Sequence, residues 1–293
     1  MKSFSSFHPT ILFLYYLLVI FISMFTMNPV ILGCSLVGSI LFFSMMNSPR
    51  AILKDIIYYF LVFILIAITN PIFSHNGETV LFFLNDKPVT VEAIIYGIAI
   101  GTMLIAVIFW SKSYSQVMTS DKFVYLFGRA IPKLSLVLSM ALRFIPMFKE
   151  QIKKVNQVQK TLGLYSSDSI TDRVLSGIRV LNSVLTWSLE NAINQADSMK
   201  SRGYGLKGRT NFSLFKFDKR DMTILIAIIL ISVIVVLGFA FNIFEFYYYP
   251  AISILKLSRV GILEYIFIFI LMILPFIIEV KENIHWKLLR SKI

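Results

Sequence analysis

Six apolar runs, each separated from the next by polar residues, set the pattern of this 293-residue chain. An α-helix needs about 20 mainly apolar residues to cross the hydrocarbon core of a bilayer, and each run approaches or reaches that length. The pattern therefore predicts an all-α membrane protein with about six transmembrane helices. The predicted spans cover residues 11–27, 30–46, 56–73, 93–110, 222–241 and 261–279.

Proline and glycine mark where the predicted spans end or approach one another. Asn28-Pro29 separates the first two spans and predicts a tight helical hairpin, because the residue before a proline avoids the helical region. Asn70-Pro71 stands near the end of the third span, where proline lacks the N–H that would continue the helix. Gly97 and Gly101 in the fourth span have the small-xxx-small spacing that lets two helices pack closely in lipid, without specifying which helix is the partner.

The segment between the third and fourth spans has a pattern typical of β-strands. Residues 79–84 and 88–91 are rich in β-branched and aromatic side chains, and they flank the polar Asn85-Asp86-Lys87. Two such runs around a polar turn predict a short β-hairpin. It would form the largest loop on the outer side of the membrane.

Composition agrees with a membrane protein and indicates its orientation. Hydrophobic residues make up 57% of the chain and the mean hydropathy is +0.77, well outside the range of soluble domains. If the N-terminus is cytoplasmic, 25 of the 28 Lys and Arg residues lie on the cytoplasmic side, as the positive-inside rule requires. These loops account for the net charge of +12, so no nucleic acid is expected as a partner. We predict a multi-pass protein of the cell (plasma) membrane with cytoplasmic N- and C-termini.

Residues that could carry chemistry are scattered along the chain. His8, His75 and His285 lie far apart and lack the short spacings of metal sites, so no metal centre is predicted. The nearest approach to an ATP-binding Walker A loop, Gly203 to Gly208, lacks its spacing and the Ser or Thr that follows its lysine. A membrane-embedded transferase or protease would need a nucleophile with its base, or a metal cluster, within the spans, and we find none. The chain is therefore predicted to be no enzyme and to bind no cofactor itself.

Residues 111–221 differ from the rest because charges recur every few residues. We therefore divide the chain into residues 1–110 with the first four spans, a cytoplasmic region of residues 111–221, and residues 222–293 with the last two spans and a basic tail. The cytoplasmic region contains two amphipathic patterns, each of which ends at a glycine.

The first amphipathic helix follows a predicted kink at Pro146 and ends at Gly163. Apolar positions recur at three- and four-residue steps, which is the period of a helix with one apolar face. Glycine commonly ends a helix because it adopts the left-handed conformation easily. The apolar positions are Ile145, Phe148, Ile152, Val155, Gln159 and Leu162.

The second amphipathic helix begins near Ser169 to Asp172, whose side chains suit a helix N-terminus, and runs to Ser201. Lys200 and Arg202 stand at its end, where cations oppose the negative end of the helix dipole, and Gly203 terminates it. Either helix alone would also fit a surface helix with an ordinary glycine cap, but the pair between membrane spans favours docking of a soluble partner. The apolar seam of this helix comprises Val174, Ile178, Leu181, Leu185, Leu189, Ala192, Ala196 and Met199.

On these residues the chain resembles the transmembrane T component of energy-coupling factor (ECF) transporters, the ATP-driven importers of vitamins and transition-metal ions. The resemblance covers nearly the full length. It rests on Asn70-Pro71, on Leu142 to Pro146, on Ser188 to Ala192 and above all on Asp197 to Gly205. It implies the predicted fold of transmembrane helices plus cytoplasmic coupling helices.

In that family, two coupling helices end in an Ala-Arg-Gly-like signature, and each arginine enters a groove of one ATPase subunit. The resemblance places the second signature at Ser201-Arg202-Gly203, followed by Tyr204 and Gly205. The first falls at Thr161-Leu162-Gly163, where leucine stands in place of arginine and Lys160 is the nearest cation. A lysine cannot reproduce the fork of a guanidinium group, so we expect unequal contacts, with the stronger one at Arg202.

The resemblance implies coupling without catalysis. Two ATP-binding cassette ATPase subunits would bind ATP, draw the helix tips together and so tilt or release a separate membrane substrate-binding (S) subunit. That subunit selects the vitamin or metal ion, so this sequence does not specify the cargo. The alternative interpretation is a non-transporting membrane scaffold or sensor that docks a soluble partner through its basic helices.

Two further charges, Arg143 and Glu190, lie in weakly polar surroundings in the cytoplasmic region. Charges near a membrane commonly face the protein interior with a partner, so one hypothesis is a buried ion pair between them. The other is that both side chains extend to the membrane interface.

Overall fold

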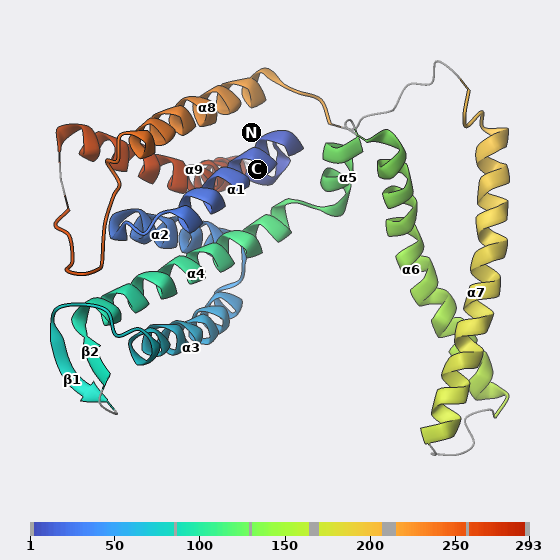
Figure 1. The fold of residues 1–293 in the computed structure, drawn as a ribbon. Coiled ribbons are helices and arrows are strands. Elements are labelled where there is room, and N and C mark those ends of the chain that lie inside the picture. The colour runs from blue at the N-terminus through green and yellow to red at the C-terminus, as the bar shows by residue number, and fades with distance from the viewer. Residues whose placement is uncertain are drawn as a thin grey trace. The chain divides into compact units, whose positions relative to one another are not determined.

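The computed structural model describes residues 3–84, 87–128, 131–163, 170–206, 215–255 and 258–290. It divides the chain into two compact units, the membrane unit of residues 1–119 and 215–293, and the helical unit of residues 120–214. Figure 1 shows the elements of both units. Those of the membrane unit are η1 Phe4–Ser6, α1 Pro9–Phe25, α2 Pro29–Met46, α3 Pro49–Phe73, β1 Val80–Leu84, β2 Lys87–Thr90, α4 Val91–Val117, α8 Lys219–Ala240 and α9 Arg259–Arg290.

Each of the six predicted spans matches one helix of the membrane unit, which confirms the all-α membrane fold. Four spans lie entirely within their helices, whereas 11–27 extends two residues past α1 and 222–241 extends one residue past α8. In the described residues, five helices are long and apolar enough to cross a membrane. The first span, α1, is a shorter apolar helix of 17 residues. The predicted hairpin between α1 and α2 is confirmed, since only residues 26–28 separate the helices and the hydroxyl oxygens of Ser23 and Ser35 lie 2.6 Å apart between them. The Asn28 side chain accepts a hydrogen bond from the Val30 N–H at 3.0 Å and so caps α2.

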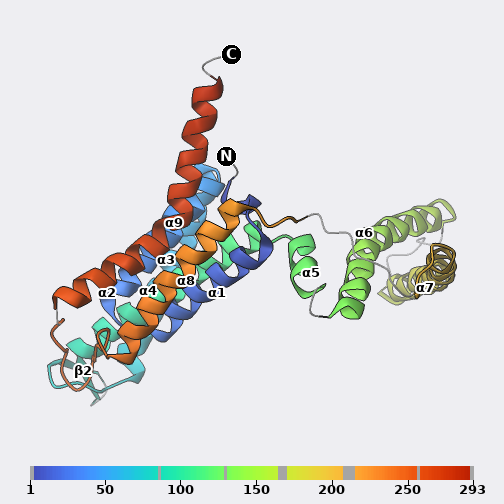
Figure 2. The same cartoon turned by 90° about the horizontal axis from the view of Figure 1, so that it is seen from above.

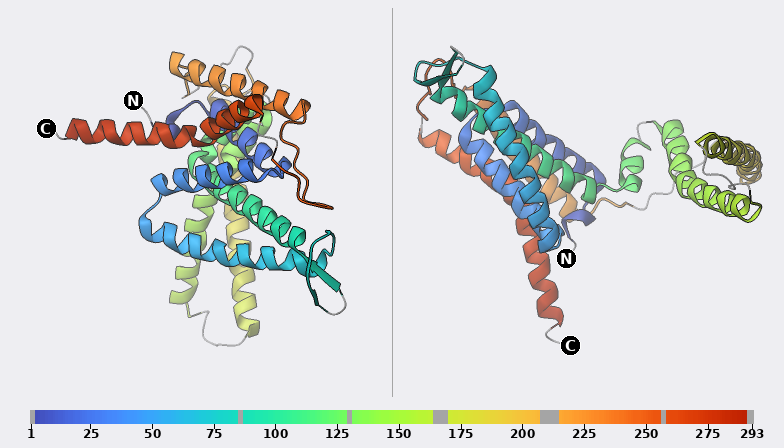
Figure 3. Two further views of the ribbon diagram at one scale, coloured as in Figure 1. Left: turned by 90° about the vertical axis from the view of Figure 1, so that its left-hand side faces the viewer. Right: turned by 90° about the horizontal axis from the view of Figure 1, so that it is seen from below.

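Several helices are longer than the apolar runs that revealed them. Helix α3 ends at Phe73 as predicted, with Pro71 inside its last turn, but it begins at Pro49 instead of 56. Helix α4 continues to Val117 and α9 to Arg290, past the predicted ends at 110 and 279. Hydropathy marks only the part of a helix that matches lipid, whereas backbone hydrogen bonds continue through polar residues. Figures 2 and 3 show the C-terminal part of α9 projecting beyond the other helices of the membrane unit.

Glycine positions fix which helices of the membrane unit pack together. A side chain at Gly97 would meet the Ala67 carbonyl at 2.7 Å and one at Gly101 would meet the Phe63 ring at 2.7 Å, so the close packing predicted for this pair is made with α3. Gly38 likewise lets α2 approach the backbone of Met272 in α9. Deeper in the core, the Trp110 indole donates to Ser35 Oγ at 3.1 Å.

The predicted β-hairpin is confirmed between α3 and α4. Strands β1 and β2 pair in an antiparallel arrangement, with Leu84 opposite Lys87. Residues 85 and 86 of the predicted turn lie outside the described residues. The Asn70 side chain donates to the Ala93 carbonyl at 2.8 Å, which ties the end of α3 to the start of α4 beside this hairpin.

The helical unit contains α5 Ser120–Gly128, α6 Pro132–Thr161 and α7 Ile170–Ser201. The short α5 was not predicted, because its nine residues hold too few turns for a period to stand out. The amphipathic helices α6 and α7 confirm the two helices predicted from the sequence, and Pro146 lies inside α6. Ser169, one end of the predicted start of α7, lies outside the described residues.

Candidate functional site

Helices α6 and α7 form an antiparallel pair. Figure 1 shows them running in opposite directions within the helical unit. The Phe148 and Trp187 rings meet edge to face with centroids 5.9 Å apart. In an antiparallel register this pairing places Gln159 level with Ser176, and both are buried. The Phe148–Trp187 ring pair therefore joins the two helices, and the buried positions of the pair are Gln159, Ser176 and Val180.

This arrangement places the two glycine-terminated ends far apart. Helix α7 starts seven residues after Gly163 and runs back along α6, so that Gly203 lies at the opposite end of the pair. A helix of 32 residues is about 48 Å long. We call the end of α6 at residues 160–163 the first tip, and the end of α7 at residues 201–205 the second tip. The geometry offers two separate docking points, one at each end of a helix pair.

At the second tip, α7 closes with a complete Schellman motif. Gly203 has φ +78°, and its N–H donates to the Lys200 carbonyl at 2.9 Å. The Tyr204 N–H donates to the Met199 carbonyl at 3.0 Å. These two bonds satisfy carbonyl groups that would otherwise lack partners at the helix end. Because the motif fixes the backbone on both sides of Arg202, it holds the base of this exposed arginine in one orientation.

Beyond the cap, the chain makes a second left-handed turn at Gly205, with φ +95°. Tyr204 therefore stands between two glycines with positive φ and is 49% exposed. Ser201, on the last turn of α7, donates to the Ser198 carbonyl at 2.9 Å and is also exposed. The second tip thus presents a hydroxyl, a guanidinium group and a phenol ring on a rigid backbone.

At the first tip the glycine has the same left-handed conformation and the same type of hydrogen bond as Gly203, but the side chains differ. Gly163 has φ +70°, and its N–H donates to the Lys160 carbonyl at 3.1 Å. Leu162 occupies the position equivalent to Arg202 and is 67% exposed. Lys160 is exposed on the last turn of α6. This tip presents an apolar side chain and a single ammonium group, so it cannot form the forked hydrogen bonds of an arginine.

The apolar seam of α7 does not face α6. Leu181, Leu185 and Leu189 are 57%, 51% and 67% exposed. On α6, Ile145 and Ile152 are exposed in the same way, at 51% and 40%. In the described residues the buried positions of the two helices are instead Gln159, Ser176 and Val180. The seam is therefore a free apolar surface of the helical unit.

Arg143 and Glu190 are not brought together. Both side chains are exposed, and the described residues contain no ion pair between them. Along α6, Lys154 instead pairs with Glu150 at 2.8 Å, and the Lys154 ammonium lowers the pKa of the Glu150 carboxyl. The hypothesis of a buried pair between Arg143 and Glu190 is thus not supported by this arrangement, because neither side chain is buried.

The sequence predicted the residues of both tips but not the contacts that hold α6 and α7 together. It identified the cap glycines and Arg202 from helix-ending chemistry, and the family resemblance implied their role. It did not identify the buried Gln159, which it assigned to an apolar face, or the ring pair that fixes the register of α6 and α7. Helix periodicity alone could have pointed to the two aromatic positions, but not to their pairing.

Comparison with known proteins gives consistent matches. Residues 3–212 match the family of cobalt transport proteins named CbiQ. The chain is similar to the energy-coupling factor transporter transmembrane protein EcfT of Listeria innocua, with 27% identity over 184 residues, 58% of this chain and 68% of the relative. It is 30% identical to EcfT of Staphylococcus aureus over 190 residues, 61% of this chain and 70% of the relative. The match with EcfT of Lactococcus lactis is 26% over 176 residues, 55% and 65% of the two chains.

Proposed function

The chain belongs to the CbiQ family of cobalt transport proteins, as a transmembrane component of the ECF type, and from this premise we propose that it couples ATPase subunits to a membrane substrate-binding subunit. ATP would be bound by two ATP-binding cassette subunits, because the chain has no phosphate-binding loop of its own. The cargo would be a vitamin or a transition-metal ion selected by the S subunit. Both termini would lie in the cytoplasm of a cell whose plasma membrane holds the complex.

The observation that carries the proposal is the antiparallel pair with one tip at each end. Two ATPase subunits of a dimer present two separate docking grooves, and two tips separated by about the 48 Å length of α7 match two separate partners. Continuous hydrogen bonding along each helix resists compression, so that a displacement at a tip is passed along the helix. Exposed cations at both tips are suited to grooves lined by carboxylates.

The free apolar seam supports a second contact. The seam combines exposed leucines with charged residues on the same helix, so lipid alone does not match it, whereas an apolar surface of a membrane protein does. We assign this surface to the S subunit. ATP-driven closure of the ATPases would then move the seam and tilt or release the S subunit.

The unequal tips predict unequal contacts. Arg202 can donate a fork of two hydrogen bonds to a carboxylate, whereas Lys160 offers a point charge on a flexible stem. Arg202→Glu should reduce co-purification of the ATPase subunits by about tenfold or more, since removing one partner of a desolvated charge pair costs roughly 2–5 kcal/mol. Lys160→Glu should have a smaller effect. Quantitative pull-down from mild detergent measures both.

Arg179→Glu is the matched control, because Arg179 is an exposed arginine of α7 that lies 23 residues before Arg202 and undergoes the same change of charge. It should leave the ATPase contact unchanged, and all three variants should insert into the membrane normally. Equal and negligible effects of the two tip variants would refute the proposal of unequal contacts. Failure of the wild-type chain to recover any ATPase subunit would favour a non-transporting scaffold or sensor instead.

A further inference from the structure

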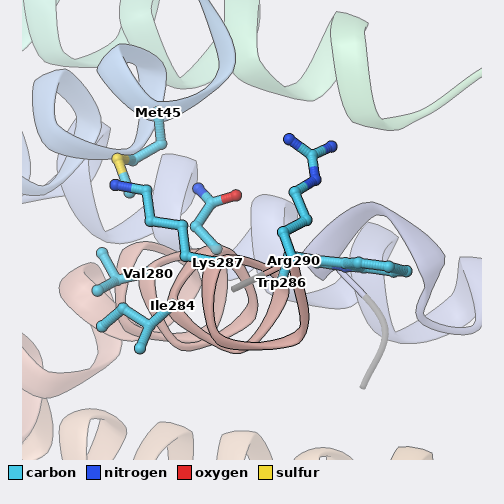
Figure 4. A pocket seen from close by; sticks show the side chains of 7 residues that line it. Met45, Val280, Ile284, Trp286, Lys287 and Arg290 are labelled. Carbon is cyan, nitrogen blue, oxygen red and sulfur yellow. The ribbon is translucent and has the colours of Figure 1, made fainter. Parts of the chain in front are cut away.

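A pocket of about 690 Å³ lies between the C-terminal part of α9 and the end of α2. Figure 4 shows it from close by. It belongs to the membrane unit and lies in a part of α9 beyond the residues that match the transporter family. The residues that line it are Met45, Val280, Asn283, Ile284, Trp286, Lys287 and Arg290.

The lining changes from apolar to cationic along the helix. Val280, Asn283, Lys287 and Arg290 follow one another at steps of three and four residues and so form one stripe of α9. The apolar end of this stripe shares the pocket with Met45 of α2, and the cationic end lies about 15 Å farther along the helix. In Figure 4 the Lys287 and Arg290 side chains extend from α9 toward the side on which Met45 lies.

The two cations of the pocket have no acidic partner in it. None of the lining residues is a carboxylate, and in the described part of the chain neither Lys287 nor Arg290 forms an ion pair. The nearest carboxylate along the helix, Glu282, is buried and accepts a hydrogen bond from the Trp286 indole at 3.0 Å. The pocket therefore carries two positive charges that an anion could neutralise.

The pocket also begins where the predicted span of α9 ends. The apolar part of α9 ends near residue 279, and its 19 residues span about 28 Å, close to the thickness of the hydrocarbon core. Val280 thus marks the edge of the core on the side where the Lys and Arg residues accumulate. Trp286 is an amphipathic ring of the kind that is enriched at the level of lipid headgroups.

We propose that this pocket binds the phosphate group of an anionic glycerophospholipid, with Lys287 and Arg290 on the phosphate and with Met45, Val280 and Ile284 against the acyl chains. A basic pocket between membrane helices on the cytoplasmic side is a known type of lipid site, and each nearby cation contributes appreciably to binding. A free phosphate ion would use only the cationic end of the stripe. A phospholipid uses both ends.

The test is native mass spectrometry of the purified full-length chain, titrated in detergent micelles with phosphatidylglycerol or with phosphatidylcholine. The wild-type chain should retain phosphatidylglycerol in preference to phosphatidylcholine. Lys287→Gln combined with Arg290→Gln should weaken retention of phosphatidylglycerol about tenfold or more. Millimolar inorganic phosphate should not displace the lipid.

Arg50→Gln combined with Lys281→Gln is the matched control. It removes one arginine and one lysine that are exposed in the membrane unit and do not line the pocket, and it should bind like the wild type. Equal loss in both double variants, equal retention of the two lipids, or displacement by inorganic phosphate would each overturn the proposal. All four altered residues are exposed, and circular dichroism will verify that each variant keeps its helix content.

Discussion

The membrane unit and the helical unit both expose large apolar side chains, but they differ in the apolar side chains that they bury. The membrane unit encloses a continuous core with fully buried aromatic rings, among them Tyr15, Phe42 and Trp110. In α6 and α7, by contrast, the buried positions of the described residues are Gln159, Ser176 and Val180. The membrane unit is stabilised by its buried hydrophobic core, whereas α6 and α7 of the helical unit leave most of their apolar side chains exposed.

The exposed surfaces themselves also differ. Helix α3 carries its charges in its first two turns and none after Asp55, so its exposed face matches lipid. Helix α7 alternates exposed leucines with charged and amide side chains along its whole length, so its face matches a protein surface. An exposed leucine therefore faces lipid on α3 and a protein surface on α7, and mutations can distinguish the two cases.

The largest difference is expected at the two tryptophans. Trp110 is fully buried and bonded to Ser35, so Trp110→Ala should destabilise the membrane unit by about 3–5 kcal/mol. Trp187 is only partly buried against Phe148, so Trp187→Ala should cost clearly less. Thermal unfolding in detergent, followed by circular dichroism, compares the two. An equal loss of stability in Trp187→Ala and Trp110→Ala would contradict the difference in burial between the membrane core and the α6–α7 pair.

The next effect concerns equally exposed leucines. Leu61, in the middle of α3, is 66% exposed and Leu181 of α7 is 57% exposed. Leu61→Asp should impair membrane insertion, because a carboxylate at the centre of a span costs about 2.5–3.5 kcal/mol. Leu181→Asp should leave insertion and folding within about 0.5 kcal/mol, as for other surface changes, and should reduce recovery of the S subunit. Membrane fractionation and co-purification measure the two outcomes.

If Leu181→Asp also prevented insertion, the seam of α7 would be a lipid-facing surface. The distinction between the exposed faces of α3 and α7 would then fail. Leu189→Asp, farther along the same seam, provides a second variant with the same expectation, since Leu189 is 67% exposed.

The smallest effect tests the cap of the second tip. Gly203 has φ +78°, a conformation that costs other residues roughly 1–2 kcal/mol, so Gly203→Ala should lower helical stability by about that amount. Gly177, inside α7 with open space around it, is the control: Gly177→Ala should stabilise the helix by about 0.5–1 kcal/mol. Opposite signs of the two changes in thermal unfolding are expected. Equal signs would show that the left-handed cap is not maintained.

The spans, the β-hairpin and both amphipathic helices were predictable from sequence because each rests on local periodicity or on local turn chemistry. The candidate site was predictable to the same extent: Gly163, Gly203 and Arg202 are marked by helix-ending chemistry. The orientation and the roles of the two tips stay predictions, and the experiments on Arg202 and Lys160 test them.

Three features depended on the tertiary structure. Gly97 and Gly101 pack against α3, although their spacing is compatible with any neighbouring helix. The leucine seam of α7 proved to be exposed, since periodicity shows that a face is apolar and not what covers it. The separation of the two tips follows from the antiparallel register of α6 and α7, which the ring contact between Phe148 and Trp187 helps to set.

The sequence by itself determined where helices form, which faces are apolar and where each helix ends, because backbone preference and side-chain period act within a few residues. Only the tertiary structure decided which faces meet, because that choice depends on shape complementarity between segments far apart in the chain. In the tertiary structure Ser176 and Val180 are the buried positions of α7 while its seam leucines are exposed, and Lys287 and Arg290 of α9 share one pocket with Met45 of α2.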